Sequence, residues 1–94
     1  MYIRLTRASF DPARYEVVKE LFQEVTDAMR TQPGFRDYYA AADRATGRVI
    51  AVSTWYWEEQ ARLDRAALGD VIGRLQAAGV RLEAPEIYET ITRA

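Results

Sequence analysis

The first third of the chain changes from a two-residue hydrophobic period to a helical one. In residues 1–7, apolar Ile3 and Leu5 alternate with more polar neighbours, which predicts a β-strand. From Tyr15 to Met29, apolar residues recur at spacings of three and four, as in an amphipathic helix that covers a sheet. An Asp-Pro pair at 11–12 favours a helix start, and Pro-Gly at 33–34 favours its end.

The middle of the chain predicts a β-hairpin. Residues 49–57 (V-I-A-V-S-T-W-Y-W) are β-branched and aromatic, with no charge, Gly or Pro, which is typical of a strand buried on both faces. Residues 35–43 precede them across a four-residue turn, although the three alanines at 40–42 also favour a helix. If Asp43 pairs with Arg48, both faces of the hairpin are largely apolar.

The last third predicts helix and then strand. Residues 58–68 begin with acidic side chains, which suit the start of a helix, and a short apolar stripe follows in residues 71–78. Residues 86–92 (E-I-Y-E-T-I-T) predict the final strand. The resulting order indicates one α+β domain over residues 1–94, a ferredoxin-like split βαβ fold with a four-stranded antiparallel sheet.

This fold predicts a homodimer. Two helical segments cover only one face of such a sheet, and the other face would be polar in a monomer. Here both faces of the hairpin carry large apolar side chains. We therefore expect two copies to pair their sheets face to face, because that arrangement covers both patches at once.

Composition excludes several kinds of function. The formal net charge of −1 predicts neither a nucleic-acid nor a membrane partner, and no apolar run is long enough to span a bilayer, so we expect a cytoplasmic protein. The chain contains no Cys, no His and no Asn. It also lacks a Gly-rich phosphate loop. We therefore expect no metal, haem or flavin cofactor.

Three short motifs carry a resemblance to a known family. They are P-G-F after the first helix, S-T-W-Y-W-E-E-Q-A from the third strand into an acidic helix start, and the Y-E-T-I ending. In these the chain resembles the antibiotic biosynthesis monooxygenase family of dimeric α+β barrels. The resemblance implies a homodimer with a pocket between sheet and helices in each subunit. It also implies a tryptophan at the end of the third strand, which is Trp55 or, in a longer strand, Trp57.

The resemblance leaves a short list of candidate catalytic residues: Trp55, Tyr38 and Arg36. Trp55 could touch a ligand or be packed as a core or pocket-wall residue. Tyr38 could position or deprotonate a phenol, the latter only with a lowered pKa. Arg36 could bind an anionic oxygen or form a salt bridge. The Asn that accompanies the tryptophan in the cofactor-free oxygenases has no counterpart, and neither does the His of the haem-degrading members.

We expect an apolar cavity between one sheet face and the first helix, where small side chains leave room. Its predicted lining residues are Ala40, Ala51, Ser53 and Trp57. Alternatively, this small-residue face lies at the centre of the barrel and serves the packing of two sheets. Two functions stay open: a cofactor-independent monooxygenase-like oxidoreductase acting on an aromatic or polyketide-like molecule, and a non-catalytic homodimer that binds an apolar ligand or serves as an accessory protein.

Overall fold

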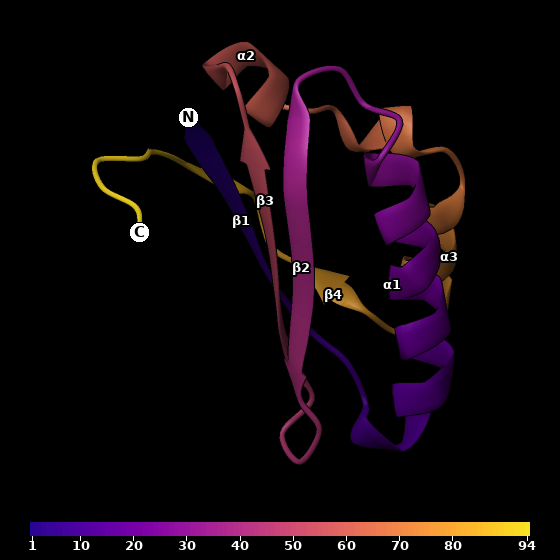
Figure 1. Ribbon diagram of the computed structural model, residues 1–94. Helices are drawn as coiled ribbons and strands as arrows, with labels where there is room; N and C mark the ends of the chain where they lie inside the picture. The colour runs from indigo at the N-terminus through magenta and orange to yellow at the C-terminus, as the bar shows by residue number, and fades with distance from the viewer.

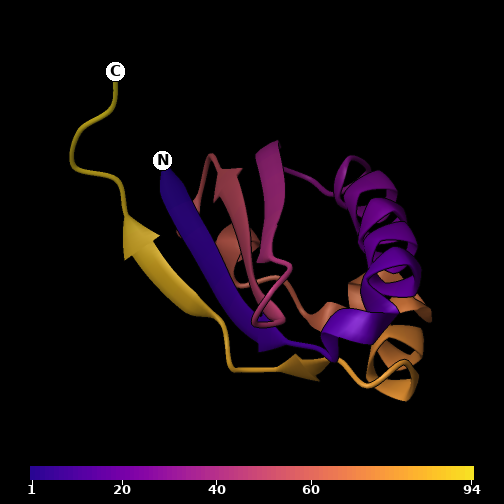
Figure 2. The ribbon, with the colours of Figure 1, turned by 90° about the horizontal axis from the view of Figure 1, so that it is seen from below.

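In the computed structural model, which describes residues 1–94, one antiparallel sheet packs against helices on a single face (Figures 1 and 2). The strands are β1 (Tyr2–Ser9), β2 (Phe35–Asp43), β3 (Arg48–Trp55), β4 (Arg81–Leu82) and β5 (Glu86–Glu89). The helices are α1 (Tyr15–Met29), α2 (Glu58–Ala61) and α3 (Val71–Ala77), with 3-10 turns η1 (Pro12–Arg14) and η2 (Arg65–Leu68).

The sheet confirms the predicted α+β class. Its order is β2-β3-β1, and both β4 and β5 pair with the remaining edge of β1. Two details differ from the sequence prediction. The two-residue strand β4 was not predicted, and β5 is shorter than the predicted 86–92.

The helix boundaries follow from their capping residues. Asp11 accepts a hydrogen bond from the backbone N–H of Ala13 at 2.9 Å, so the first turn is η1 and α1 continues from it. The predicted helix over 58–68 is interrupted instead. Asp64 caps η2 through the N–H of Ala66 at 3.0 Å, which starts a new turn after α2 ends at Ala61.

The hairpin has the predicted register up to one irregularity. Asp43 pairs with Arg48, and Tyr38 lies opposite Ser53. A β-bulge between Phe35 and Asp37 then places Phe35, rather than Arg36, opposite Trp55. A bulge inserts one extra residue and reverses the direction of the side chains beyond it.

The two sheet faces have opposite environments. The inner face, toward α1 and α3, carries Arg4, Thr6, Ser53 and Trp55, all buried. The outer face carries no helix (Figure 2). It nonetheless carries a group of large apolar side chains, Ile3, Leu5, Tyr39, Ile50, Val52 and Tyr88, together with the polar Arg7, Asp37, Thr54 and Glu86.

Candidate functional site

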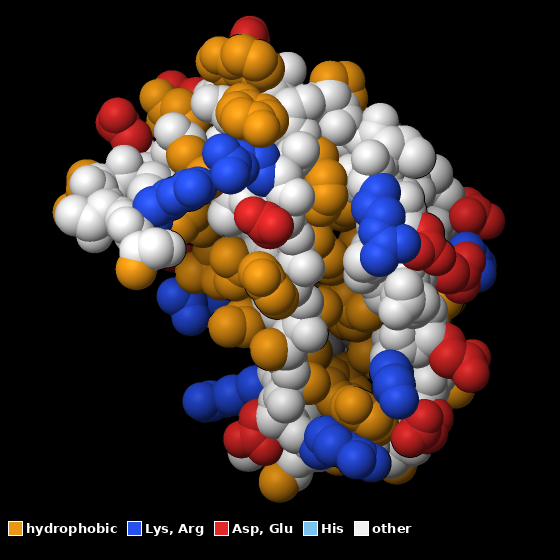
Figure 3. Space-filling view, viewed as in Figure 1, with side chains coloured by type: hydrophobic (Ala, Val, Ile, Leu, Met, Phe, Trp, Pro, Cys, Tyr) orange, Lys and Arg blue, Asp and Glu red, His pale blue; other side chains and the backbone are white.

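A cavity of about 200 Å³ lies between α1 and the β2–β3 hairpin, and most of its lining residues are hydrophobic. Figure 3 shows it as a hollow between β2 and α1, with hydrophobic side chains inside and basic side chains at its rim. On the sheet side, Ala40, Ala42 and Val49 line it, because alanines on the edge strand leave the space beneath α1 unfilled. The small-residue face therefore faces the helices and not the exposed side of the sheet.

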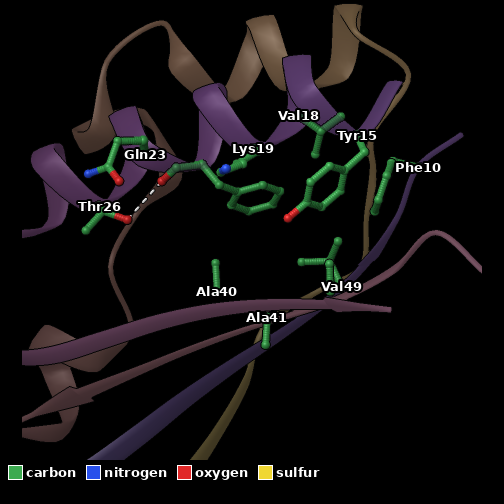
Figure 4. Close-up of a pocket in the computed structure, with 11 residues that line it drawn as sticks. Phe10, Tyr15, Val18, Lys19, Gln23, Thr26, Ala40, Ala41 and Val49 are labelled. Carbon is green, nitrogen blue, oxygen red and sulfur yellow. Dashed lines mark hydrogen bonds between the residues drawn. The ribbon is translucent and has the colours of Figure 1, made fainter. Parts of the chain in front are cut away.

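Tyr15, at the start of α1, is one of the polar residues that line the cavity. Its hydroxyl points into the space between α1 and the sheet (Figure 4). The ring lies 6.2 Å from that of Phe10, centroid to centroid, and the guanidinium carbon of Arg44 lies 4.1 Å from the Tyr15 centroid. A cation over the ring adds positive potential at this end of the cavity.

The hairpin turn that carries Arg44 is fixed against the end of β1. The N–H of Phe10 donates to the carbonyl of Gly47 at 2.8 Å. Gly47 has a φ of +76°, and a Cβ there would lie 2.0 Å from the carbonyl oxygen of Phe10. Only glycine allows this close approach, so the turn holds Arg44 and Phe10 around Tyr15.

Three further polar side chains of α1 line the cavity: Lys19, Gln23 and Thr26 (Figure 4). Thr26 donates its hydroxyl hydrogen to the carbonyl of Phe22 at 2.9 Å. Lys19 is exposed and is the only lysine of the chain. The site thus combines apolar walls with a phenol, an amide and an ammonium group on one side, a pattern typical of small-molecule pockets.

Of the residues singled out from the sequence, Ala40 lines this cavity, and three others line a second, smaller one. The second cavity has a volume of about 40 Å³, and Tyr38, Ala51 and Ser53 are among its lining residues. Burial raises the pKa of Tyr38 well above its ordinary value of 10. Tyr38 is therefore a neutral phenol that can donate a hydrogen bond, and the lowered pKa that a role as base requires is not found.

Trp55 is enclosed in the core and lines neither cavity. It is 0% exposed, and its indole Nε1 donates to the hydroxyl of Ser53 at 2.8 Å. Its ring meets Phe35 edge to face at 5.7 Å between centroids. Trp55 thus connects the end of β3 to the start of β2 as a packing residue.

The structure separates Arg36 and Trp57 from both cavities. Because of the bulge, the guanidinium of Arg36 lies 4.8 Å from the ring centroid of Tyr56 instead of beside Tyr38. Trp57 is 58% exposed, because β3 ends at Trp55 and Trp57 is already the N-cap of α2. Trp57 therefore does not line the cavity as predicted.

The sequence reasoning missed the polar groups that do line the cavities. From the sequence, Tyr15 counts among the apolar residues of the first helix, and Lys19 is not singled out. Arg4 and Arg65, which line the smaller cavity, were not singled out at all. The available signal was the position of Lys19, one turn after Tyr15, so that both border the same face of α1.

No three carboxylates lie close enough to hold a metal ion together. None of the helices has the length and apolar character needed to cross a bilayer.

Comparison with known proteins gives one family. The model of the antibiotic biosynthesis monooxygenase family matches residues 1–70, which confirms the resemblance found in the sequence. The comparison with curated proteins found no match.

Solved structures share the fold at low sequence identity. A candidate antibiotic biosynthesis monooxygenase from Deinococcus radiodurans aligns with a TM-score of 0.80 and 18% identity, covering 100% of this chain and 96% of the other. SnoaB, a cofactor-independent oxygenase from Streptomyces nogalater, aligns with a TM-score of 0.74 and 15% identity, covering 98% of this chain and 94% of SnoaB. Rv0793 from Mycobacterium tuberculosis aligns with a TM-score of 0.70 and 12% identity, covering 100% of this chain and 99% of Rv0793.

Proposed function

Because the chain belongs to the antibiotic biosynthesis monooxygenase family, we propose that it binds a small aromatic or polyketide-like molecule and promotes its oxidation by dioxygen. The reaction would need no metal, haem or flavin. The observation that carries this proposal is the apolar cavity of about 200 Å³ with the Tyr15 hydroxyl and Lys19 on one side. That SnoaB is a cofactor-independent oxygenase supports the absence of a cofactor.

The chemistry is the conversion of an activated CH₂ group, as in an anthrone, to a carbonyl. The substrate loses a proton to solvent to give an enolate, which supplies the electrons to dioxygen, and a proton returns from solvent to give a hydroperoxide. One oxygen atom forms the new carbonyl and the other leaves as water. The apolar walls remove water from the enolate, while Lys19 and the Tyr15 hydroxyl stabilise its negative oxygen.

Oxygen uptake with a panel of anthrones and hydroquinones tests the proposal. We expect Ala40→Phe to abolish both binding and oxygen uptake, because the added ring fills the cavity. Ala40→Ser is the matched control, which keeps the volume small and should keep both. Uptake that is unchanged in Ala40→Phe would contradict the assignment of this cavity.

A second function is favoured by one specific observation. Trp55, the tryptophan that ends β3, is fully enclosed and cannot touch a ligand in either cavity. The protein would then be a non-catalytic ligand-binding or accessory protein of the same fold. Tight binding of the panel without oxygen uptake would favour this function over the first.

The working form of the protein is, in this proposal, a cytoplasmic homodimer. Its support is the outer face of the sheet, which carries apolar side chains without any covering helix. Tyr39 is 68% exposed on this face and Tyr88 is 52% exposed. A patch of this kind is characteristic of an interface, and a two-fold axis would bury it in both copies. Sedimentation of the wild-type chain as a stable monomer would contradict the dimer.

A further inference from the structure

Two arginine side chains, Arg4 and Arg65, line the smaller cavity of about 40 Å³. Arg4 comes from β1 and is only 5% exposed. Arg65 comes from the start of η2, on the other side of the cavity. No carboxylate is among the residues that line this cavity.

Neither guanidinium has an acidic partner. Arg4 donates through Nη1 to the carbonyls of Ala61 and Leu63, at 3.1 and 2.7 Å, and Arg65 donates to the carbonyl of Glu83. Neither residue takes part in any of the ion pairs of the chain. A guanidinium has five N–H donors, and the protein acceptors of Arg4 are both bound by Nη1.

Burying the Arg4 guanidinium without an acidic partner is electrostatically costly. Burial, and then the charge of Arg65, lower the pKa of Arg4. A buried charge is normally paired, because its desolvation is otherwise uncompensated. The hydrogen bonds from Nη1 of Arg4 hold the segment after α2, but a neutral donor could bind the same two carbonyls. These bonds explain neither the positive charge of Arg4 nor the second arginine that lines the cavity.

The remaining polar groups of the cavity also suit an anion. Tyr38, Ser53 and Thr6 contribute hydroxyl groups. Tyr38 is neutral because its pKa is raised, so it can donate a hydrogen bond. The volume is close to that of one or two water molecules, each of which takes about 30 Å³ in the liquid. It admits a carboxylate group but not a ring.

We infer that Arg4 and Arg65 form an anion site for the carboxylate of an aromatic or polyketide-like acid, whose ring system occupies the larger cavity. Phe22 lines both cavities, so the two spaces are neighbours across this side chain. Bidentate pairing of a guanidinium with a ligand carboxylate would supply the negative charge that no lining residue of this cavity provides. The inference rests on the proposed function and adds the class of substrate.

The test is calorimetric titration of the purified protein with 1-naphthoate and its neutral analogue 1-naphthamide. We expect naphthoate to bind more tightly than naphthamide. Arg65→Gln should weaken naphthoate binding by about 10- to 100-fold and leave naphthamide binding unchanged. The control is Arg62→Gln, which removes an equal charge from an exposed arginine paired with Glu58 at 2.8 Å, and it should change neither affinity.

Two further arms keep the test decisive. Arg4→Lys retains the charge at β1 and should weaken naphthoate binding less than Arg4→Gln, provided that circular dichroism shows both variants folded. Acetate should bind far more weakly than naphthoate, because it cannot fill the larger cavity. Equal affinity for naphthoate and naphthamide in the wild-type protein would overturn the anion site alone. If neither probe binds, the cavity function itself fails.

Discussion

The outer face of the sheet makes a prediction that a single charge can test. Ile50 lies on β3 in this face, and Val17 lies on α1, on the opposite side of the molecule. Both side chains are 43% exposed in the single chain. If two copies pair through the outer face, Ile50→Asp should dissociate the dimer, whereas Val17→Asp should leave it intact.

The size of the effect follows from the exposed fraction of Ile50. Fully burying an isoleucine side chain contributes about 1.5–3 kcal/mol, so covering the exposed 43% contributes roughly 1 kcal/mol in each copy. Two-fold symmetry doubles this to about 2 kcal/mol, which is roughly a 30-fold change in the dissociation constant. Burying an unpaired carboxylate in each copy would raise the free-energy cost of dimerisation by at least several kcal/mol more. The dimer should therefore be lost at ordinary working concentrations.

Sedimentation velocity over a wide range of protein concentration measures the outcome. Circular dichroism of each variant shows whether the fold is kept, which matters because aspartate is unfavourable in a strand. The reasoning is refuted if Ile50→Asp sediments as the same dimer as the wild type. It is also refuted if Val17→Asp dissociates the dimer to the same extent.

Three further predictions concern stability, each measured by urea unfolding. Ser53→Ala should destabilise the protein by about 1–3 kcal/mol, because the indole N–H of Trp55 then loses its acceptor in a fully buried position. Gly47→Ala should cost clearly more than Gly69→Ala, which has a similar positive φ but open space around its Cβ position, and equal costs would contradict the close approach at the turn. Hydrogen bonds from Tyr88 and then Arg7 lower the pKa of Glu86. The stability that the Glu86 carboxylate contributes is therefore present at neutral pH and is lost as the pH falls below the ordinary pKa of 4.5. Glu86→Gln should remove that acid-side loss, and an unchanged pH profile would contradict it.

The register of the hairpin could be predicted because its turn is local. A four-residue loop ending in glycine fixes Asp43 opposite Arg48, and the alternation of side chains then fixes each pair as far as Tyr38 and Ser53. The bulge near Arg36 could not be predicted in the same way. It depends on how Phe35 packs on Trp55, which is a contact between strand ends that no short sequence pattern encodes.

The cavity was partly predictable for a similar reason. Alanines at alternating positions on one face of a strand leave space wherever a helix covers them, as Ala40 and Ala42 do beneath α1. Which polar groups line that space depends on the angle at which α1 crosses the sheet. The placement of Tyr15 also needs the turn at Gly47 to reach the end of β1, a contact between segments far apart in the chain.

The alternation of side chains on β1 bears on both the proposed dimer and the proposed anion site. In a monomer, alternation would place Ile3 and Leu5 toward the helices and Arg4 and Thr6 toward water. The structure has the reverse: Arg4 and Thr6 are buried beneath the helices, and the apolar pair lies on the outer face. Each half of this inversion is unfavourable in an isolated chain, because it exposes apolar side chains on one face and buries an arginine without an acidic partner on the other. A second copy on the outer face and an anion beside Arg4 would compensate both, so loss of the dimer and loss of anion binding should each lower stability through a different face of the same strand.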